Sequence, residues 1–460
     1  MPFSEDALLA QLRRLGPVTG LRVAYSGGLD SSVLLHALAS LRACLGAPLE
    51  AVHVDHALLP QARAWRAHCR AVCAALGVPL RVLEVEVAPL RAALGVEAAA
   101  RRARYGALAA LLGPGDCLLT AHHRDDQAET VLLQLFRGSG PAGLAAMPGV
   151  APLGKGRLVR PLLGFDRSEL RAYAVARAIG FVEDPSNADR RLARGFLRAE
   201  VMPRLRAHWP GIERTLARAA RHAADAAAIV AERAAEDLAA LTASTPWRMP
   251  AAALMCLPAP RGRALLRHWC QARGVAVPDT ARLDEVFGQL ATARADRPIA
   301  VAWPGGAFRR YRDSLLLTPE LPAHDSETRL PWDVRRPLAL PSGLGTLRLV
   351  AGGPLRRDAL TGHIEVRFRT AGLRCAPAGR SGHHDLKHLF QEAGVPPWLR
   401  DRVPLVVVGG ELAAIADRWV CAAAASSDGT AGLEVVWDRP AHLDVWTSAS
   451  ARSPVGRGFL

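Results

Sequence analysis

Ser26-Gly27-Gly28-Leu29-Asp30-Ser31-Ser32 stands directly after the apolar run Leu21-Arg22-Val23-Ala24-Tyr25 and directly before an apolar stretch that begins at Val33. This order predicts a strand, a glycine turn and the start of a helix, where the helix N-terminus carries partial positive charge. Glycines let a backbone approach a polyphosphate closely, and serines add hydroxyl donors. The stretch therefore predicts a phosphate-binding loop. The only lysines are Lys155 and Lys387, so the loop is not of the Walker type, which needs Gly-Lys-Ser/Thr.

Asp30 is the unexpected member of this loop. A carboxylate repels phosphate unless a cation lies between them, so Asp30 predicts a Mg²⁺ ion that bridges it to a nucleotide. The alternative is an ordinary capped turn, which Ser, Asp and Gly all suit. We disfavour it because two glycines, one aspartate and three serines within seven residues exceed what capping needs.

Apolar segments alternate with longer amphipathic segments through the first half of the chain. The predicted strands are Leu21–Tyr25, Leu49–Val54, Leu80–Val85 and Cys117–Ala121. This alternation predicts an α/β domain with a parallel sheet covered by helices on both faces. Ligands of such sheets bind beyond the carboxyl ends of the strands. The phosphate loop, the string from His53 to His56 and the string from His122 to Glu129 each follow a strand, so we expect them to meet at one edge.

The third string is rich in acids. If Asp126 to Leu135 forms a helix, Asp126 and Glu129 share one face, and Asp125 also meets Glu129. Helix capping explains Asp125 or Asp126 without any chemistry, but it does not explain Glu129 or the paired histidines. Carboxylates at this edge are suited to an ammonium group, and a neutral imidazole is suited to positioning or deprotonating a nucleophile.

Arg101 and Arg104 lie three residues apart on a segment, opened by Glu97, that we predict to be helical. An exposed basic face is the ordinary explanation of such spacing. The functional alternative is neutralisation of phosphate charge, for which arginine forks are better suited than lysine.

Composition bounds the possibilities independently. A length of 460 residues suits two to four domains, and the formal charge of +15 with a pI near 10.5 favours a polyanionic partner such as nucleic acid. The alternative is that the positive charge reflects compositional drift toward arginine and not selection for a polyanionic partner. The N-terminus does not have the pattern of a signal peptide, and no stretch is long enough for a membrane span. The scattered cysteines fit a reducing cytoplasm and do not fit a zinc or iron–sulfur site; Cys69 and Cys73, one helical turn apart, are typical of small core residues.

Composition also sets the expected domain boundaries. An Ala-rich helix at Ala217–Ala243 connects the first domain to a small, mainly helical unit, and acids and prolines from Pro319 to Pro341 predict a linker. Short strands at Leu344–Val350, Ile364–Arg369, Leu405–Val408 and Leu412–Ala416, with a helix at Asp385–Ala393, predict an α+β terminal domain. We therefore expect an α/β domain at 1–215, a connecting helix at 216–245, a mainly helical domain at 246–320, a linker at 321–340, an α+β domain at 341–440 and a disordered tail at 441–460.

The terminal domain is rich in cations, at Arg367, Arg369, Arg374, Arg380, Lys387, Arg400 and Arg402. These residues suit a solvated face, but Trp398 among them offers a surface on which an unpaired base stacks. The pattern leaves both interpretations open.

The phosphate loop resembles the signature loop of the PP-loop ATP pyrophosphatases. The strings that narrow the resemblance are His53-Val54-Asp55-His56-Ala57-Leu58, Glu97 to Tyr105, Thr120 to Thr130, Arg137-Gly138-Ser139-Gly140, Arg160-Pro161-Leu162-Leu163, Glu183-Asp184-Pro185-Ser186-Asn187 and Gly394 to Arg400. Together they resemble the tRNA(Ile)-lysidine synthase family from the N-terminus to about Val420, most strongly before Pro203. One departure is Arg194-Gly195, where the family commonly has Arg-Asn.

The resemblance implies a fold, a reaction and roles for individual residues. The fold is a PP-loop domain of the adenine nucleotide alpha hydrolase type, followed by tRNA-binding domains. The reaction uses ATP and Mg²⁺ to adenylate C2 of the cytidine at the first anticodon position of a tRNA(Ile) with a CAU anticodon, and L-lysine then displaces AMP. The residues implied in ATP binding are Ser26, Gly27, Gly28, Leu29, Asp30, Ser31, Ser32 and His53, with Asp30 as the metal ligand. Those implied in catalysis are Asp30, Arg101, Arg104, His123, Asp126 and Glu129, with Asp126 and Glu129 assigned to the lysine pocket.

Two rival interpretations stay open at this stage. A related tRNA thiolase would use the same loop with a sulfur nucleophile, but such enzymes commonly need paired cysteines or an iron–sulfur cluster, whose spacing this chain lacks. A tRNA-binding protein with a vestigial nucleotide domain is the other rival, which the retained carboxylates Asp30, Asp126 and Glu129 disfavour. The sequence does not fix the oligomeric state and leaves a homodimer open.

Overall fold

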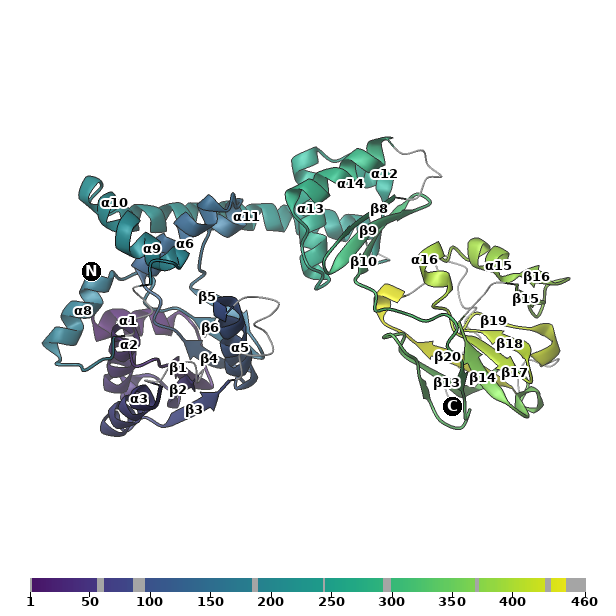
Figure 1. Ribbon diagram of the computed structural model, residues 1–460, viewed down its shortest axis with the longest axis horizontal. Coiled ribbons are helices and arrows are strands. Elements are labelled where there is room, and N and C mark those ends of the chain that lie inside the picture. The colour runs from purple at the N-terminus through teal and green to yellow at the C-terminus, as the bar shows by residue number, and fades with distance from the viewer. Residues whose placement is uncertain are drawn as a thin grey trace. The chain divides into compact units, whose positions relative to one another are not determined.

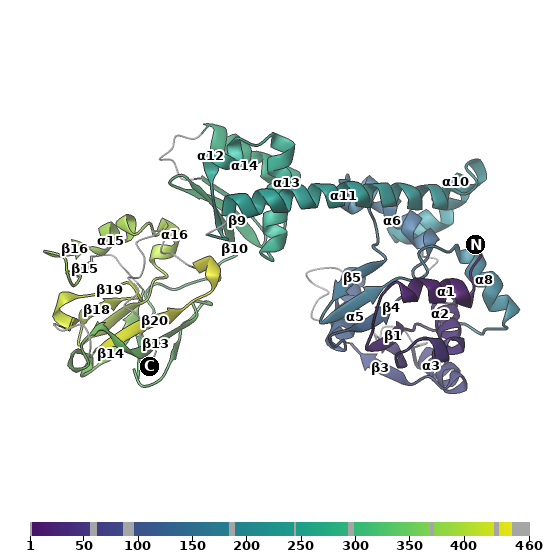
Figure 2. The ribbon, with the colours of Figure 1, turned by 180° about the vertical axis from the view of Figure 1, so that it is seen from behind.

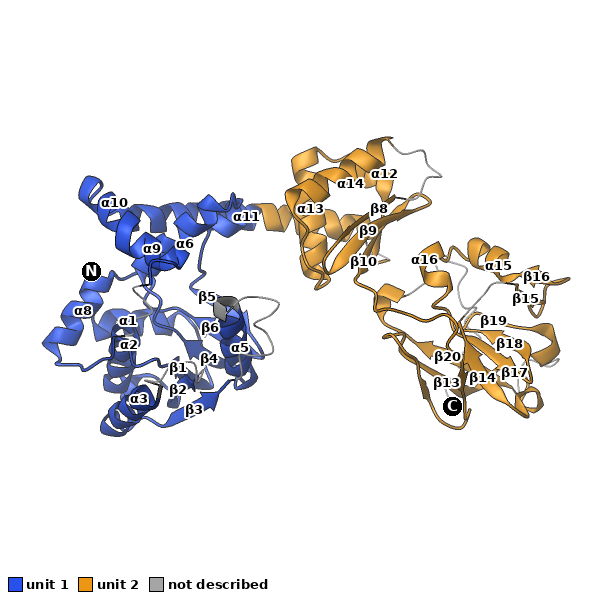
Figure 3. Cartoon of the chain, in the orientation of Figure 1, with its two compact units in different colours: residues 1–229 blue, residues 230–460 orange. Residues whose placement is uncertain are grey.

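The structure is a computed structural model that describes residues 2–55, 62–85, 96–183, 189–242, 245–292, 299–368, 372–426 and 432–443. It divides into two compact units, residues 1–229 and residues 230–460, which Figure 3 shows in different colours. Four of the sequence predictions lie outside the described residues: His56 with its neighbours, the string from Asp184 to Asn187, the cation Arg369, and the tail from Ser448.

A six-stranded sheet forms the centre of the first unit, with the strand order β3-β2-β1-β4-β6-β5 (Figure 1). Strands β1, β2, β3, β4 and β6 are parallel, as predicted, and β5 adds an antiparallel edge. The four strands predicted in the first half of the chain are all present. The elements of the sheet and its helices are α1 (Glu5–Arg13), β1 (Gly20–Ala24), α2 (Leu29–Ser40), η1 (Arg42–Cys44), β2 (Leu49–Asp55), α3 (Ala62–Leu76), β3 (Leu80–Glu84), α5 (Val96–Ala110), β4 (Asp116–Leu119), α6 (Arg124–Phe136), α7 (Pro141–Leu144), β5 (Val150–Leu153), β6 (Gly156–Val159) and α8 (Arg167–Ala176).

Both faces of this sheet are covered because successive strand residues point to opposite sides. Val23 and Leu119 face a core formed with α1, α2, α3 and α8, whereas Val52 and Leu118 face a second core formed with α5. Figures 1 and 2 show α2 and α3 on one side of the sheet and α5 on the other. This burial on both faces explains the nearly continuous apolar character of the strands.

The first unit continues into a stretch of helices that lies beside α6. Its elements are α9 (Ala193–Phe196), the π-helical turn η3 (Leu197–Val201), α10 (Met202–His208) and the long helix α11 (Ile212–Thr242), which continues into the second unit. Leu197 and Met202 pack against the apolar side of α6. The π turn directly precedes Pro203, whose ring would crowd the carbonyl four residues earlier in a regular α-helix. Such wide turns are common at functional sites.

The second unit begins with three helices packed against a four-stranded antiparallel sheet of order β7-β10-β9-β8. Trp269 and Phe308 are fully buried at the centre of this core. The elements are β7 (Arg248–Pro250), α12 (Ala251–Met255), α13 (Ala259–Ala272), α14 (Thr280–Thr292), β8 (Ile299–Trp303), β9 (Gly306–Tyr311) and β10 (Ser314–Pro319).

The remainder of the second unit is rich in antiparallel strands, in sheets of order β11-β14-β17-β18-β19 and β12-β13-β20 with a short β15–β16 pair. The stretch predicted to be a linker is instead part of the folded region. It contributes β11 and β12 and places Trp332 in the core with 5% of its surface exposed. The elements are β11 (Leu330–Pro331), β12 (Leu338–Ala339), β13 (Thr346–Leu355), η4 (Asp358–Leu360), β14 (Ile364–Arg367), β15 (Arg374–Cys375), β16 (His384–Asp385), α15 (Leu386–Glu392), α16 (Pro397–Arg400), β17 (Leu405–Val408), β18 (Glu411–Ile415), β19 (Trp419–Val420), η5 (Ala422–Ala424), β20 (Leu433–Asp438) and η6 (Ala441–Leu443).

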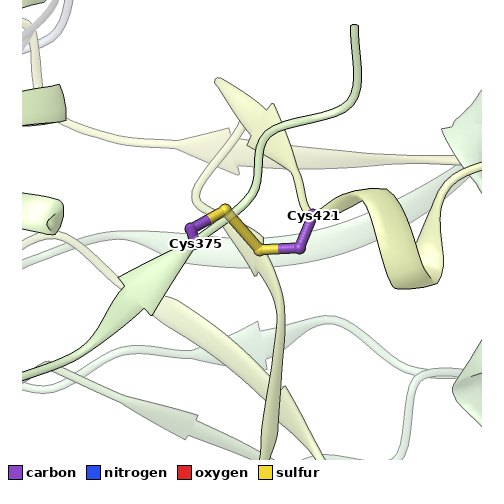
Figure 4. The surroundings of a disulfide bond; sticks show 2 residues. All are labelled: Cys375 and Cys421. Atoms are coloured by element: carbon purple, nitrogen blue, oxygen red, sulfur yellow. A yellow bond between two sulfur atoms is a disulfide. The ribbon is translucent and has the colours of Figure 1, made fainter. Parts of the chain in front are cut away.

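Two cysteines of this region, Cys375 and Cys421, form a disulfide (Figure 4). Their spacing gave no sign of the pair, since they are 46 residues apart and meet only through the fold. Cys69 and Cys73, by contrast, are confirmed as small core residues, because both are buried and burial raises the pKa of each thiol, to about 12 and about 11. Within the described residues, no helix combines the length and the apolar character that crossing a membrane requires.

Candidate active site

The site lies where the strand order of the large sheet reverses. Strands β1 and β4 are neighbours, but the chain leaves β1 toward β2 on one side and leaves β4 toward β6 on the other. Such a reversal opens a crevice beyond the strand ends. A cavity of about 690 Å³ occupies this position, and its walls come from the ends of β1, β2 and β4, from α5 and α8, and from the helical stretch α9–η3. The phosphate loop, the string that begins at His53 and the string that begins at His122 therefore meet at one edge of the sheet, as predicted.

The phosphate loop lines one wall through Ser26, Gly28, Leu29, Asp30 and Ser31. The loop is held by its own serines, since the backbone N–H of residue 26 donates to Ser31 Oγ at 3.3 Å and the two hydroxyl oxygens are 2.9 Å apart. Helix α2 starts directly behind the loop, with Gly28 as its N-cap. The open helix end and the hydroxyls thus face the cavity together.

The other two loop residues lie behind this wall. Gly27 has φ of +84°, and a Cβ at that position would lie 3.0 Å from Cys69 Sγ. Ser32 is fully buried, 3.4 Å from the hydroxyl of Tyr25 and from the carbonyl of Gly27. Both residues therefore shape the loop from below, whereas His53, within β2, reaches the cavity, with its Nδ1 2.9 Å from the carbonyl oxygen of Tyr25.

His123 lies beneath the cavity floor at the N-terminus of α6. It is 2% exposed, with its ring nitrogens 3.6 Å from Asp30, 3.6 Å from Asp125 and 3.4 Å from Asp126. Burial opposes the charged form, but hydrogen bonds that the ring donates to Asp125 and Asp30, together with the charge of Asp126, outweigh it and raise the pKa of His123 to about 10. At that pKa the side chain is protonated at neutral pH and lies among three carboxylates, whereas the sequence had offered a neutral imidazole at this site without choosing between His122 and His123.

His122 is the neutral member of the histidine pair. It lines the cavity, and its Nδ1 lies 2.9 Å from the hydroxyl of Thr120. Burial lowers the pKa of His122 to about 4, against the opposing charge of Asp126. An imidazole that accepts a proton or a hydrogen bond at this site is therefore His122.

Asp126 and Glu129 lie on one face of α6, as predicted, but at different depths. Asp126 lines the cavity, whereas Glu129 lies behind it with 2% of its side chain exposed. Arg198, from the π turn, donates to both oxygens of Glu129, through Nε at 2.8 Å and Nη2 at 2.9 Å, and lies 3.2 Å from Asp126. Arg194 adds a second cation 3.4 Å from Glu129. Burial raises the pKa of Glu129, although Arg198 opposes that shift.

The two arginines of α5 are placed differently. Arg104 lines the cavity with its guanidinium 5.6 Å from the ring centre of Tyr105, and its burial lowers its pKa. Arg101 is exposed, stacks over the same ring at 4.9 Å and is not among the residues that line the cavity in the described part of the chain.

Several cavity residues were not singled out from the sequence. Arg167 and Arg171 of α8 line the cavity, and their i,i+4 spacing was a usable signal. Trp65, Phe181 and Arg198 gave no comparable signal, because each reaches the cavity through tertiary packing. Gly195, which the sequence marked as a departure from the family pattern, also lines the cavity, and a Cβ there would lie 2.0 Å from the carbonyl oxygen of Asp189. The family's asparagine does not fit this backbone.

Asp30 fits a magnesium ion as the sequence predicts. Within the described residues, its Oδ1 is buried without a hydrogen-bond partner and lies 3.8 Å from Arg167, while its Oδ2 lies 3.6 Å from the ring of His123. The same residues contain no cluster of three or more His, Cys, Asp or Glu side chains that would form a metal cage. Magnesium is commonly held by one or two carboxylates together with substrate phosphates, which is the donor set available here.

Comparison with known proteins identifies the family. Residues 7–205 match the model of a PP-loop domain, residues 249–316 that of a TilS substrate binding domain and residues 364–437 that of a TilS substrate C-terminal domain. A tRNA(Ile)-lysidine synthase of Alkalilimnicola ehrlichii is 48% identical over 90% of this chain and 93% of its own length. The chain belongs to the tRNA(Ile)-lysidine synthase family.

A second tRNA(Ile)-lysidine synthase, from Methylococcus capsulatus, is 43% identical over 95% of this chain and its whole length. Among solved structures, the U34-tRNA thiolase NcsA from Methanococcus maripaludis shares 16% identity and a TM-score of 0.38, over 47% of this chain and 77% of its own. That likeness is too low to bear on function. The resemblance seen in the sequence is therefore confirmed by full-length members of the tRNA(Ile)-lysidine synthase family.

Proposed function

We propose that this protein uses ATP to join lysine to C2 of the cytidine at the first anticodon position of a tRNA(Ile) with a CAU anticodon, which forms lysidine. The observation that carries the proposal is the cavity at the sheet reversal, where the phosphate loop, Asp30 and Asp126 face one space in a chain that matches the family over nearly its full length. The C2 oxygen first attacks the α-phosphate of ATP and releases pyrophosphate. The ε-amine of lysine then attacks C2 and releases AMP.

The loop wall is assigned to the phosphates of ATP. Ser26, Gly28 and Ser31 provide amide and hydroxyl donors at the open end of α2. Asp30 would hold Mg²⁺, which when bound neutralises phosphate charge and steadies the pyrophosphate leaving group.

Arginines on the remaining walls suit the charge that develops during adenylation. Arg104, Arg167 and Arg171 line the same cavity from two helices. Fixed guanidinium groups stabilise a transferring phosphoryl group without reorganisation during the reaction. We assign them to the α-phosphate and the departing pyrophosphate, with Arg104 taking the role that the sequence shared between Arg101 and Arg104.

Asp126 and Arg198 suit the two charged ends of a free amino acid. Asp126 presents a carboxylate to the α-ammonium, and Arg198, whose Nη2 lies 3.2 Å from Asp126 Oδ1, presents a guanidinium to the α-carboxylate. Glu129 and Arg194 lie behind them and fix the orientation of Arg198. In this arrangement Glu129 is a positioning residue, which acts on lysine through Arg198.

Neutral His122 is assigned to the reacting amine. Its Nδ1 is engaged with Thr120, which leaves Nε2 as the ring nitrogen available to the substrate. An acceptor at that point orients the lone pair of the lysine ε-amine toward C2 and receives a proton during attack.

The rival functions have less support. A thiolase needs a reactive sulfur, but no cysteine is among the described residues that line the cavity, and the nearby Cys69 is buried with its pKa raised to about 12. A vestigial domain would have no need to retain Asp30 and Asp126 at the cavity wall. Since ATP and tRNA are cytoplasmic substrates, we propose that the protein acts in the cytoplasm.

The test combines ATP, Mg²⁺, radiolabelled lysine and an isoleucine tRNA transcript with a CAU anticodon, beside an initiator methionine tRNA with the same anticodon. We expect label on the isoleucine tRNA alone. Asp30→Asn should abolish pyrophosphate release while tRNA binding persists, and the control Asp225→Asn, an exposed position of α11, should behave as the parent protein. Equal labelling of both tRNAs, or full turnover by Asp30→Asn, would contradict the proposal.

A further inference from the structure

The helical stretch 193–208 has two functional faces. One face, with Gly195, Arg198 and Ala199, lines the cavity of the candidate active site. The other lines a second cavity of about 520 Å³ that the candidate site does not use, through Phe196, Glu200, Val201, Arg204 and Leu205 together with Arg190. Residues 195 and 199 and residues 196, 200 and 204 follow four-residue steps, so each set forms a stripe, and the two stripes point in different directions.

The second cavity combines an apolar floor with a charged rim. The Phe196 ring is 49% exposed, although such rings are usually buried, and Val201 and Leu205 are half-buried beside it. At the rim, the Arg190 guanidinium lies 2.6 Å from the Glu200 carboxylate, and that of Arg204 lies 3.9 Å from it. Both arginine side chains are largely exposed, at 69% and 84%.

These groups match an unpaired nucleobase. A flat ring stacks on phenylalanine whatever its identity, and exposed arginines bind the phosphates on either side of it. Glu200 adds an acceptor for an exocyclic amino group, the contact by which acids recognise such bases. A metabolite that carries only a phosphate would not need the apolar floor, and an apolar peptide would not need two largely exposed arginines at the rim.

We propose that this cavity binds an unpaired base of the RNA substrate, next to the nucleotide that enters the active site. The inference rests on the proposed function, since it assumes that an RNA strand reaches the active-site cavity. The two cavities are lined by different faces of one helical stretch, whose diameter with side chains is about 10 Å. A single strand spans that thickness within a few nucleotides, so one anticodon loop reaches both cavities.

The test measures binding of the full-length protein to the isoleucine tRNA transcript. Phe196→Ala should weaken binding about tenfold, as loss of one stacked base does. Phe196→Tyr keeps the stacking ring and should restore it. The control is Phe136→Ala, because Phe136 is also exposed, at 67%, and belongs to neither cavity.

Abasic transcripts identify the base. Removing the base that occupies the cavity should weaken binding by the parent protein about tenfold but leave binding by Phe196→Ala unchanged, because the contact is already lost. Binding by Phe196→Ala within twofold of the parent, or losses that multiply for every abasic position, would overturn the inference. Lysine labelling separates the two proposals. If the parent labels the tRNA and Phe196→Ala binds normally, only this inference fails; if the parent labels no tRNA but the Phe196 effect is present, the proposed function fails.

Discussion

Arg198→Met should destabilise the N-terminal unit in a way that reveals how Glu129 is held. The substitution keeps an apolar stem but removes two charge-assisted hydrogen bonds, of 2.8 and 2.9 Å, from a carboxylate that is 2% exposed. Removing one partner of a buried pair costs about 3–5 kcal/mol, because the remaining charge is uncompensated. Arg194, 3.4 Å from Glu129, offsets part of this cost, and Arg198 is itself 29% exposed. We therefore expect a loss of about 2–3 kcal/mol at neutral pH.

Scanning calorimetry measures this loss as a lower melting temperature of the N-terminal transition. For a unit of this size, the expected loss corresponds to about 4–12 °C. The deficit should shrink on acidification. Burial already raises the pKa of Glu129, and losing Arg198 raises it further, so the folded state takes up a proton more readily than the unfolded state does. The penalty is complete above the folded-state pKa of Glu129 and disappears as the pH falls toward the ordinary glutamate value of 4.5.

Two further variants make the result decisive. Arg198→Met combined with Glu129→Gln removes the unpaired charge and should recover most of the lost stability. Arg191→Met is the matched control, because the Arg191 side chain is 90% exposed and its ion pair with Asp189 contributes little. A deficit for Arg198→Met that is independent of pH and is not relieved by Glu129→Gln would refute the idea that this arginine exists to hold the buried carboxylate.

Three other variants test the loop, the neutral histidine and the departure from the family pattern. Relative to Gly138→Ala, the substitution Gly27→Ala should lose more ATP binding, measured by calorimetric titration, than it loses stability. Both glycines have positive φ, but only a Cβ at Gly27 would press against a buried thiol. Equal effects of the two substitutions on ATP binding would contradict this. Because the pKa of His122 is lowered to about 4, the unfolded chain binds a proton more readily than the folded one, and stability should fall as the pH drops from 6.5 to 4. His122→Gln should remove that part of the acid sensitivity of the melting temperature. An unchanged pH profile of the melting temperature would argue against a buried neutral imidazole. Gly195→Asn should lower the melting temperature, because its Cβ would lie 2.0 Å from a backbone carbonyl oxygen, whereas Gly180→Asn, with open space around it, should be tolerated; an equal response would argue against the close approach.

The parts of the site that could be predicted are those set by local pattern and sheet topology. Short-range patterns predict the apolar strands, the phosphate loop that follows β1 in the chain, and the shared helix face of Asp126 and Glu129. Their convergence follows from one rule about parallel sheets. The sequence raised a helix from Asp126 to Leu135 as a condition, and α6 covers that stretch, from Arg124 to Phe136.

The rest depended on contacts between distant segments. Adjacent histidines look alike in a sequence, but the fold surrounds His123 with three acids and buries His122 beside fewer acids. This difference separates the pKa values of the two histidines widely. The pairing of Glu129 with Arg198 joins residues 69 positions apart through the packing of the π turn on α6. The acids and prolines around Trp332 looked like a linker, although the tryptophan itself anchors the stretch in a core.

Because β13 pairs with β20, the two halves of the chain can complete their sheets at different times during synthesis. Residues 346–355 must wait for residues 433–438 before their sheet can close, whereas the large sheet of the first unit is complete once β6 has emerged at Val159. At about 5–20 residues per second, roughly ten to fifty seconds separate release of the first unit from release of β20. The nucleotide-binding half thus has time to assemble on the ribosome before the last strand of the terminal sheet exists.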